Sequence, residues 1–189
     1  ETYDIEVEAE EDQYVAGLEF VELNGADIAT SSLGYIDWYT QADLDGATAV
    51  TTLAVNVATA NGLFCVTAAG NNDHDADPAT SSLIAPSDAP DVISVGAVDP
   101  DGLPADFTSD GPTADGRVKP EIMATGGPAV TISSDDPSGY VYANGTSLAT
   151  PLVAGVMGCL IQAHPDWTVP ILRARLIDTA DPAGSPKPD

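Results

Sequence analysis

The stretch Asn61-Gly-Leu-Phe-Cys-Val-Thr-Ala-Ala-Gly-Asn71 decides the fold class that this sequence predicts. Residues 63–68 form an apolar run of strand length, and Asn61-Gly62 separates this run from a helical pattern over residues 42–60. A strand that is apolar on both faces is typical of a parallel sheet covered by helices on both sides. We therefore expect residues 63–68 to be a buried strand of such a sheet.

Further elements on either side of this stretch alternate between helix and strand. Apolar residues at helical spacing predict a helix over residues 12–24, with Gly25 following its C-terminal end. Residues 1–12 hold seven acids, and Glu6-Val-Glu8-Ala-Glu10 alternates with period two, which predicts an exposed edge strand or a solvated lead-in. The other expected elements are strands at 27–31, 92–98 and 129–133 and helices at 42–60, 148–163 and 169–180. This order predicts one α/β domain over residues 1–189, with three layers and a mainly parallel sheet flanked by helices.

Composition indicates a globular protein with an extreme charge balance. Hydrophobic residues make up 43% of the chain, whereas 30 acidic residues stand against 5 basic ones, for a net charge of −25. Nucleic acid is excluded as a partner because phosphate binding needs clustered Lys and Arg. The acidic excess is consistent with adaptation to high salt, with an acidic secreted enzyme or with divalent-cation binding. Composition does not choose among these.

The apolar segments bear on membrane insertion and on the cysteines. The longest uncharged apolar stretch, residues 148–161, is shorter than the roughly 18 residues that cross a bilayer, so we expect a buried helix and no membrane span. Cys65 and Cys159 both lie in apolar runs. This placement predicts two free, buried thiols, and it leaves the redox compartment open.

A candidate nucleophile lies where this apolar helix begins. Asn144-Gly-Thr-Ser-Leu-Ala-Thr-Pro151 places Ser147 near the helix N-terminus, where the helix dipole favours developing negative charge. Pro151 is accepted there because the N–H groups of the first turn have no intrahelical acceptor. The alternative is that these hydroxyls only cap the helix.

A candidate electrophilic group follows the strand at 63–68. Active sites in parallel sheets gather beyond the carboxyl ends of the strands, and Asn71 lies there. A side-chain amide in that place can donate a hydrogen bond to a developing oxyanion. Alternatively, Asn71 is a turn residue that bonds its own backbone.

Together these motifs resemble the subtilase family (peptidase S8), the subtilisin-like serine endopeptidases. Gly145-Thr-Ser-Leu-Ala-Thr-Pro151 resembles the nucleophile motif G-T-S-x-A-S/T-P, and Ala68-Ala-Gly-Asn71 resembles A-A-G-N. The resemblance covers residues 12–180 in the family's order. The other matching stretches are Ser31-Ser-Leu-Gly34, Phe107-Thr-Ser-Asp-Gly-Pro112, Asp115-Gly-Arg-Val-Lys-Pro120 and His164-Pro-Asp-Trp167.

The resemblance implies an acyl-enzyme mechanism for peptide-bond hydrolysis. Ser147 would be the nucleophile, and Asn71 would hold the oxyanion with a backbone N–H near Ser147. Ile84 would stand at the base of the main specificity pocket, where the family often has a small residue, and would make the pocket shallower. The implied substrate-binding residues are Ser32, Leu33 and Gly34, which would pair with the peptide backbone, and Ala68, Ala69 and Gly70, which would line one pocket wall.

The sequence departs from the family pattern because it lacks the motifs that carry the catalytic Asp and His. Subtilases carry their catalytic residues in the order Asp, His, Ser, and neither the D-S/T-G nor the H-G-T-H motif occurs here. His164 is at the far end of the nucleophile helix, and His74 lies in an acidic loop where the family places no base. We therefore expect the Asp and His segments upstream of Glu1, which makes this chain the C-terminal half of a catalytic domain cut at both ends and inactive by itself.

Two alternatives to a protease remain at this stage. A subtilase-fold binding module without the Asp and His would be a pseudoprotease. An esterase of the α/β-hydrolase class is disfavoured, because that class needs G-x-S-x-G and Ser147 is followed by Leu148-Ala149.

The family resemblance also implies partners and a location. Protein or peptide substrates and an extracellular or cell-envelope location follow from it, and no cofactor is required for the chemistry. Structural Ca²⁺ is common in the family, and the loop Asp73–Asp77 is the candidate place for it. A solvated acidic loop is the favoured interpretation, so no metal ligand is assigned.

Overall fold

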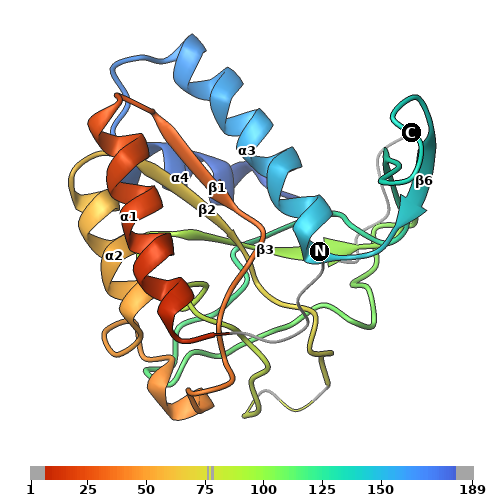
Figure 1. Cartoon of the computed structure of the whole chain (residues 1–189), viewed down its shortest axis with the longest axis horizontal. Helices are drawn as coiled ribbons and strands as arrows, with labels where there is room; N and C mark the ends of the chain where they lie inside the picture. The colour runs from red at the N-terminus through yellow and green to blue at the C-terminus, as the bar shows by residue number, and fades with distance from the viewer. Residues whose placement is uncertain (1–6, 76, 78, 182–189) are drawn as a thin grey trace.

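A four-stranded parallel sheet forms the centre of the protein in the computed structural model, which describes residues 7–75, 77 and 79–181 (Figure 1). Its strands are β1 (Ile28–Ser31), β2 (Phe64–Ala68), β3 (Ile93–Val98) and β4 (Ile122–Thr125), in the order β1-β2-β3-β4. Helices α1 (Ala9–Leu23) and α2 (Val50–Ala60) cover one face, and α3 (Thr146–Ala163) and α4 (Val169–Thr179) cover the other. The predicted three-layer α/β fold with a parallel sheet is confirmed.

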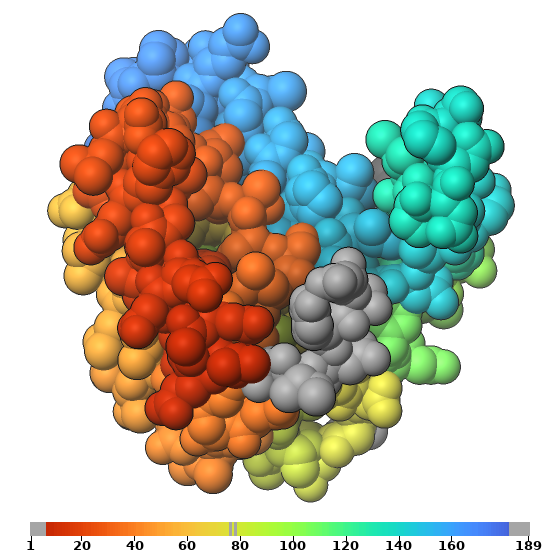
Figure 2. All heavy atoms as spheres, in the orientation of Figure 1, coloured from red at the N-terminus to blue at the C-terminus, as the bar shows by residue number. Residues whose placement is uncertain are grey.

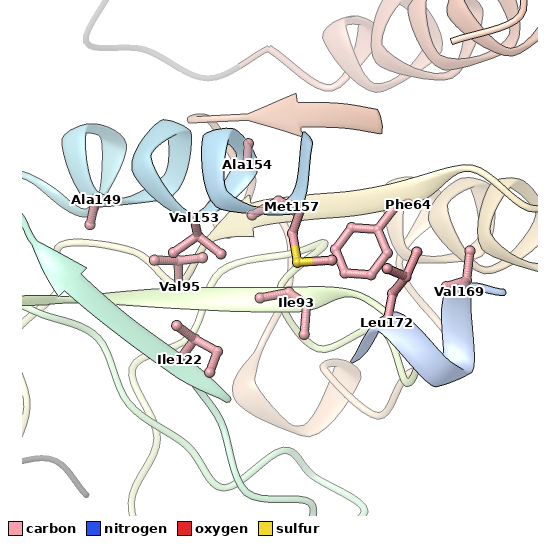
Figure 3. Packing of buried hydrophobic residues seen from close by; sticks show 11 residues of the cluster. Phe64, Ile93, Val95, Ile122, Ala149, Val153, Ala154, Met157, Val169 and Leu172 are labelled. Atoms are coloured by element: carbon pink, nitrogen blue, oxygen red, sulfur yellow. The ribbon is translucent and has the colours of Figure 1, made fainter. Parts of the chain in front are cut away.

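Alternating side chains of β2 pack into different cores on the two faces of the sheet. Phe64 and Val66 belong to the core beneath α3 and α4, together with Met157 of α3 (Figure 3). Cys65 points the other way, into the core with Leu18 of α1. Burial on both faces explains why β2 is apolar at every position except Thr67.

A two-stranded antiparallel hairpin stands away from this body (Figure 2). It consists of β5 (Ala129–Ile132), which the sequence predicted, and β6 (Tyr140–Ala143), which it did not. Tyr140 and Tyr142 are each 76% exposed. Strand β4 was also missed, because a four-residue strand after a proline gives no pattern long enough to recognise.

The helix expected at residues 42–60 is shorter than predicted. Gln41–Asp43 form a 3₁₀ turn, and α2 begins only at Val50. Between them Gly46 has φ +83°, a conformation that interrupts a helix and favours glycine. The buried Asp88 carboxylate accepts a hydrogen bond from Gly46 N at 2.8 Å and holds this turn in place.

The first helix begins earlier than predicted. Residues 9–12 are the first turn of α1, so the edge strand or lead-in expected there is wrong for these positions; residues 1–6 lie outside the described residues. Glu11 is only 2% exposed. Its carboxylate accepts hydrogen bonds from Trp38 Nε1, Tyr39 OH and the Thr51 backbone N–H, which join α1 to the start of α2.

Helix α3 is buried on one face only, which corrects the expectation of a fully buried helix. Leu152 is 52% exposed and Val156 is 51% exposed, and Cys159 on the same side is exposed instead of buried. By length and composition α3 would be able to cross a membrane, because the structure extends it to 18 residues. Its opposite face packs against all four parallel strands, as expected for the core helix of a globular fold.

Candidate active site

Ser147 lies in the first turn of α3, beside the carboxyl ends of β1 and β2. The turn before it depends on Gly145, whose φ of +153° is rarely adopted by residues with a side chain. Backbone N–H groups in the first turn of a helix have no intrahelical acceptor. The Ser147 N–H is therefore free to bind a substrate atom.

Asn71 is fixed against this turn through its side-chain oxygen. Asn71 Oδ1 accepts hydrogen bonds from the Thr146 backbone nitrogen at 2.9 Å and from Thr146 Oγ1 at 3.0 Å. Because both bonds use the oxygen, the Nδ2 group is left to donate elsewhere. A Cβ built on Gly145 would lie 3.6 Å from Ser147 N and 3.8 Å from Asn71 Nδ2, so the two donors border one small space.

Ser147 is held on its other side by Ser32, the residue that follows β1. Ser147 Oγ donates to the Ser32 carbonyl oxygen at 3.2 Å, and Ser32 Oγ donates to the Ser147 carbonyl oxygen at 2.8 Å. The second bond has a cause in the sequence. Pro151 has no N–H, so the carbonyl of Ser147 four residues earlier has no helical donor, and Ser32 supplies one.

This arrangement corrects the explanation of Pro151 given by the sequence. Helix α3 begins at Thr146, so Pro151 lies beyond its first turn and removes a regular helical hydrogen bond. The sequence did not identify Thr146 as the partner of Asn71, although Thr146 is the first residue of the helix that carries Ser147. Its hydroxyl also donates to the Gly70 carbonyl, which joins the end of β2 to the first turn of α3.

The predicted substrate-binding residues lie on both sides of this turn. Ser32 and Leu33 are exposed after β1, and Leu33 is 47% exposed. Ala68, Ala69 and Gly70 are buried at the end of β2. Ile84 lies between the two segments, because its N–H donates to the Ala69 carbonyl at 3.2 Å.

Neither histidine hydrogen-bonds to Ser147 in the part of the chain that the structure describes. His164 follows the last residue of α3, about 25 Å from Ser147 at 1.5 Å per residue, and stacks on Trp167 with ring centroids 3.8 Å apart. His74 lies in the acidic loop, where it interacts electrostatically with Asp75 and Asp110. The described residues therefore bring a serine hydroxyl and two N–H groups together, and neither described histidine bonds to that hydroxyl.

No calcium site is found in the acidic loop among the residues that the structure describes. Among residues 7–75, 77 and 79–181, no three His, Cys, Asp or Glu side chains converge as metal ligands. Asp75 Oδ1 instead accepts from Thr80 Oγ1 at 2.8 Å and from the Asp77 N–H at 2.7 Å. These bonds lower the pKa of Asp75, with the Thr80 hydroxyl as the largest cause.

Comparison with known proteins identifies the family of the chain. The sequence profile of the subtilase family matches residues 6–189. The chain belongs to the subtilase family. It is 36% identical over 172 residues to a subtilisin of Bacillus pumilus, covering 90% of this chain and 55% of the relative. It is also 36% identical to subtilisin E of Bacillus subtilis, covering 90% of this chain and 40% of that relative.

Solved structures of other subtilase-fold proteins are similar to this one. A cold-adapted subtilisin-like serine proteinase has a TM-score of 0.70 at 26% identity, over 90% of this chain and 55% of its own. The self-cleaved protease domain of PatA has a TM-score of 0.74 at 29% identity, over 92% of this chain and 61% of its own. The chain thus spans about half the length of the subtilases it matches.

Proposed function

We propose that the full-length protein is a serine endopeptidase that hydrolyses peptide bonds through an acyl-enzyme on Ser147. The observation that carries this proposal is the convergence of two N–H donors, Asn71 Nδ2 and Ser147 N, beside the Ser147 hydroxyl. Membership of the subtilase family supports the same reaction class. Similarity of fold alone would not support a reaction class, since one fold hosts many functions.

In this mechanism Ser147 Oγ attacks the scissile carbonyl and loses its proton to a histidine. The carbonyl oxygen becomes an anion, which Asn71 Nδ2 and the Ser147 N–H stabilise. Because the helix dipole and the fixed amide are already oriented, this stabilisation needs no rearrangement during the reaction. The histidine gives this proton to the amine product, which leaves as the C–N bond breaks, and water then hydrolyses the acyl-enzyme.

The histidine and its carboxylate partner come, in this proposal, from a segment upstream of Glu1. Two surfaces near Ser147 are suited to receive it. Strand β1 is an edge of the sheet, paired only with β2 in the part of the chain described. The exposed side of α3 carries Leu152 and Val156, which a packed segment would cover. Residues 1–189 would then be part of a catalytic domain and inactive in isolation.

A subtilase-fold binding module is the second candidate. It is favoured by the fact that neither described histidine bonds to Ser147. A pseudoprotease would have the same fold and the same Asn71–Thr146 contact, but its upstream segment would lack the Asp and His motifs. The two candidates therefore differ in reactivity and not in architecture.

The partners follow from the proposed reaction. Protein or peptide substrates are expected from this reaction, and membership of the subtilase family favours an extracellular or cell-envelope location. No cofactor takes part in the proposed steps, because the nucleophile, the oxyanion donors and the base are all protein groups. The proposal makes no use of a metal ion.

The test is labelling of the full-length protein with a fluorophosphonate, followed by mass spectrometry of the modified peptide. We expect stoichiometric modification of Ser147 and hydrolysis of casein, both absent from Ser147→Ala. Residues 1–189 expressed alone should take up no label, since an unassisted hydroxyl is a poor nucleophile. A full-length protein that stays unlabelled would favour the binding module, and labelling of the isolated chain would contradict the upstream base.

A further inference from the structure

Ile84 occupies the space between the two segments that flank the nucleophile. Its backbone N–H donates to the Ala69 carbonyl at 3.2 Å. The next residue, Ala85, exchanges two hydrogen bonds with Tyr35, of 3.0 and 2.8 Å. The backbone of residues 84 and 85 thus joins the segment after β1 to the end of β2, so the position of the Ile84 side chain is fixed from both sides.

Two glycines mark where this side chain lies. A Cβ built on Gly34 would come within 2.6 Å of Ile84 Cδ1 and 2.7 Å of Ile84 Cγ1. A Cβ built on Gly70 would lie 3.3 Å from Ile84 Cγ2. The isoleucine therefore fills the gap between Gly34 and Gly70, while part of its surface remains exposed to solvent.

The same gap is next to the reacting groups. Ser32, two residues before Gly34, hydrogen-bonds Ser147 in both directions, and Asn71 directly follows Gly70. We call the substrate residue whose carbonyl carbon is attacked by Ser147 the acyl residue. With its carbonyl oxygen at Asn71 Nδ2, the acyl residue would direct its side chain into the gap between the two segments.

We propose that Ile84 blocks this gap and restricts the acyl residue to glycine and alanine. The proposal rests on the proposed peptidase function and specifies its substrate class. A larger side chain would have to displace a β-branched residue whose backbone N–H bonds Ala69 and whose neighbour Ala85 is bonded to Tyr35, which is costly in a packed site. Steric exclusion of this kind discriminates well against side chains that are too large.

The test compares peptides that differ only in the acyl residue, with the full-length enzyme. We expect kcat/KM for alanine to exceed that for phenylalanine by at least about tenfold. In Ile84→Gly, and to a lesser degree in Ile84→Ala, the phenylalanine-to-alanine ratio should rise by at least about tenfold. Ile84→Leu, which keeps the side-chain volume, should retain the preference for alanine. Circular dichroism checks that each variant is folded.

Two results would overturn the proposal: equal cleavage after alanine and phenylalanine by the unmodified enzyme, or no change of the ratio in folded Ile84→Gly and Ile84→Ala. If no peptide is cut, the proposed peptidase function fails. The role of Ile84 is then tested by the binding of peptides instead of their cleavage. Calorimetry would then compare product peptides ending in alanine or phenylalanine. A preference for alanine that is lost in Ile84→Gly supports the blocked gap, whereas equal affinities or no binding contradict it.

Discussion

Ser32 Oγ donates a hydrogen bond to the carbonyl oxygen of Ser147 at 2.8 Å, across 115 residues of sequence. The acceptor is the carbonyl that Pro151 leaves without a helical donor, so the end of β1 replaces the missing bond of α3. The first turn of α3 is thereby held by the segment after β1, which also borders the proposed substrate site. This contact makes the position of Ser147 depend on a residue that takes no chemical part in the proposed mechanism.

The first prediction is a coupling between Ser32 and Pro151. Ser32→Ala should lower the unfolding free energy by about 1 kcal/mol and reduce kcat, because it leaves the Ser147 carbonyl without a donor. Pro151→Ala restores the helical N–H. The double variant should therefore lose less unfolding free energy and less kcat than Ser32→Ala alone. Urea unfolding and steady-state kinetics of all four proteins form the double-mutant cycle. Strict additivity would show that the two residues act independently.

The second prediction separates two roles of Asn71. Asn71→Ala and Asn71→Asp both remove the Nδ2 donor, and kcat should fall by about 10²–10³, the range known for the loss of one oxyanion donor in a subtilisin. Only Asn71→Ala also removes the oxygen that accepts from Thr146 N. It should therefore lose about 1 kcal/mol of stability that Asn71→Asp keeps. Unchanged kcat in both variants would remove Asn71 from the proposed mechanism.

The third prediction concerns a buried charge cluster. Glu121 Oε1 lies 2.7 Å from Lys119 Nζ and 2.6 Å from Arg173 Nη2. Glu121→Gln should cost about 3–5 kcal/mol of unfolding free energy, because it leaves the buried Lys119 ammonium without its partner. Asp115→Asn is the control, since it breaks the exposed pair with Arg117 and should cost about 0–1 kcal/mol.

The pH dependence of the Glu121→Gln variant follows from the same burial. Burial already lowers the pKa of Lys119 below its usual value, and loss of Glu121 removes the attraction that opposes this shift. A base whose folded pKa is lowered costs stability while it is charged, and this cost falls as pH rises toward the unfolded pKa of about 10.4. The deficit measured by urea unfolding should therefore shrink between neutral and alkaline pH. If Glu121→Gln lost the same unfolding free energy at all pH values, the charge of Lys119 would not be the cause of that loss.

The sequence predicted the buried layers of this fold better than its loops and edges. The strands at 63–68 and 92–98 were predicted within a residue, because burial on both faces favours apolar residues at nearly every position. The start of α2 was misplaced, because Gly46 and Asp88 end the helical pattern through a contact 42 residues apart that no local spacing reveals. Likewise the exposed face of α3 is as apolar as its buried face, so periodicity could not distinguish them.

The candidate site was predicted in part for a similar reason. Ser147 and Asn71 stand in motifs whose glycines and small residues are visible in the sequence. The role of Thr146 depends on a hydrogen bond that spans 75 residues, and the role of Ser32 on one that spans 115. Such partners become apparent only when the ends of β1, β2 and the start of α3 are brought together.

The fourth prediction uses the two cysteines to test how the proposed upstream segment packs. Burial raises the pKa of the Cys65 thiol to about 12, so Cys65 should not react with Ellman's reagent before unfolding. Cys159 lies on the exposed side of α3, where the upstream segment is proposed to pack. It should react rapidly in residues 1–189 alone and slowly in the full-length protein. Rapid reaction of Cys159 in both proteins would mean that the segment packs elsewhere.

The last prediction is that stability increases with monovalent salt. Arg117, Lys119 and Arg173 are already paired with Asp115 and Glu121, so most of the 30 acidic residues have no cation available and the folded state repels itself. Raising the ionic strength from 0.15 M to 1 M shortens the screening length from about 8 Å to about 3 Å, and the melting temperature should climb throughout.

A calcium site predicts a different response of the same protein. Binding at Asp73–Asp77 would saturate with Ca²⁺ at low concentration, because it acts by mass action and not by screening. The measurement is a thermal melt of full-length Ser147→Ala, first in rising KCl with a chelator and then in rising CaCl₂ at constant ionic strength. We expect the melting temperature to rise in the KCl series and not with Ca²⁺, since Asp75 of this loop accepts hydrogen bonds from Thr80 Oγ1 and the Asp77 N–H. A flat KCl series with a jump at millimolar Ca²⁺ would contradict screening and make the acidic loop a metal site.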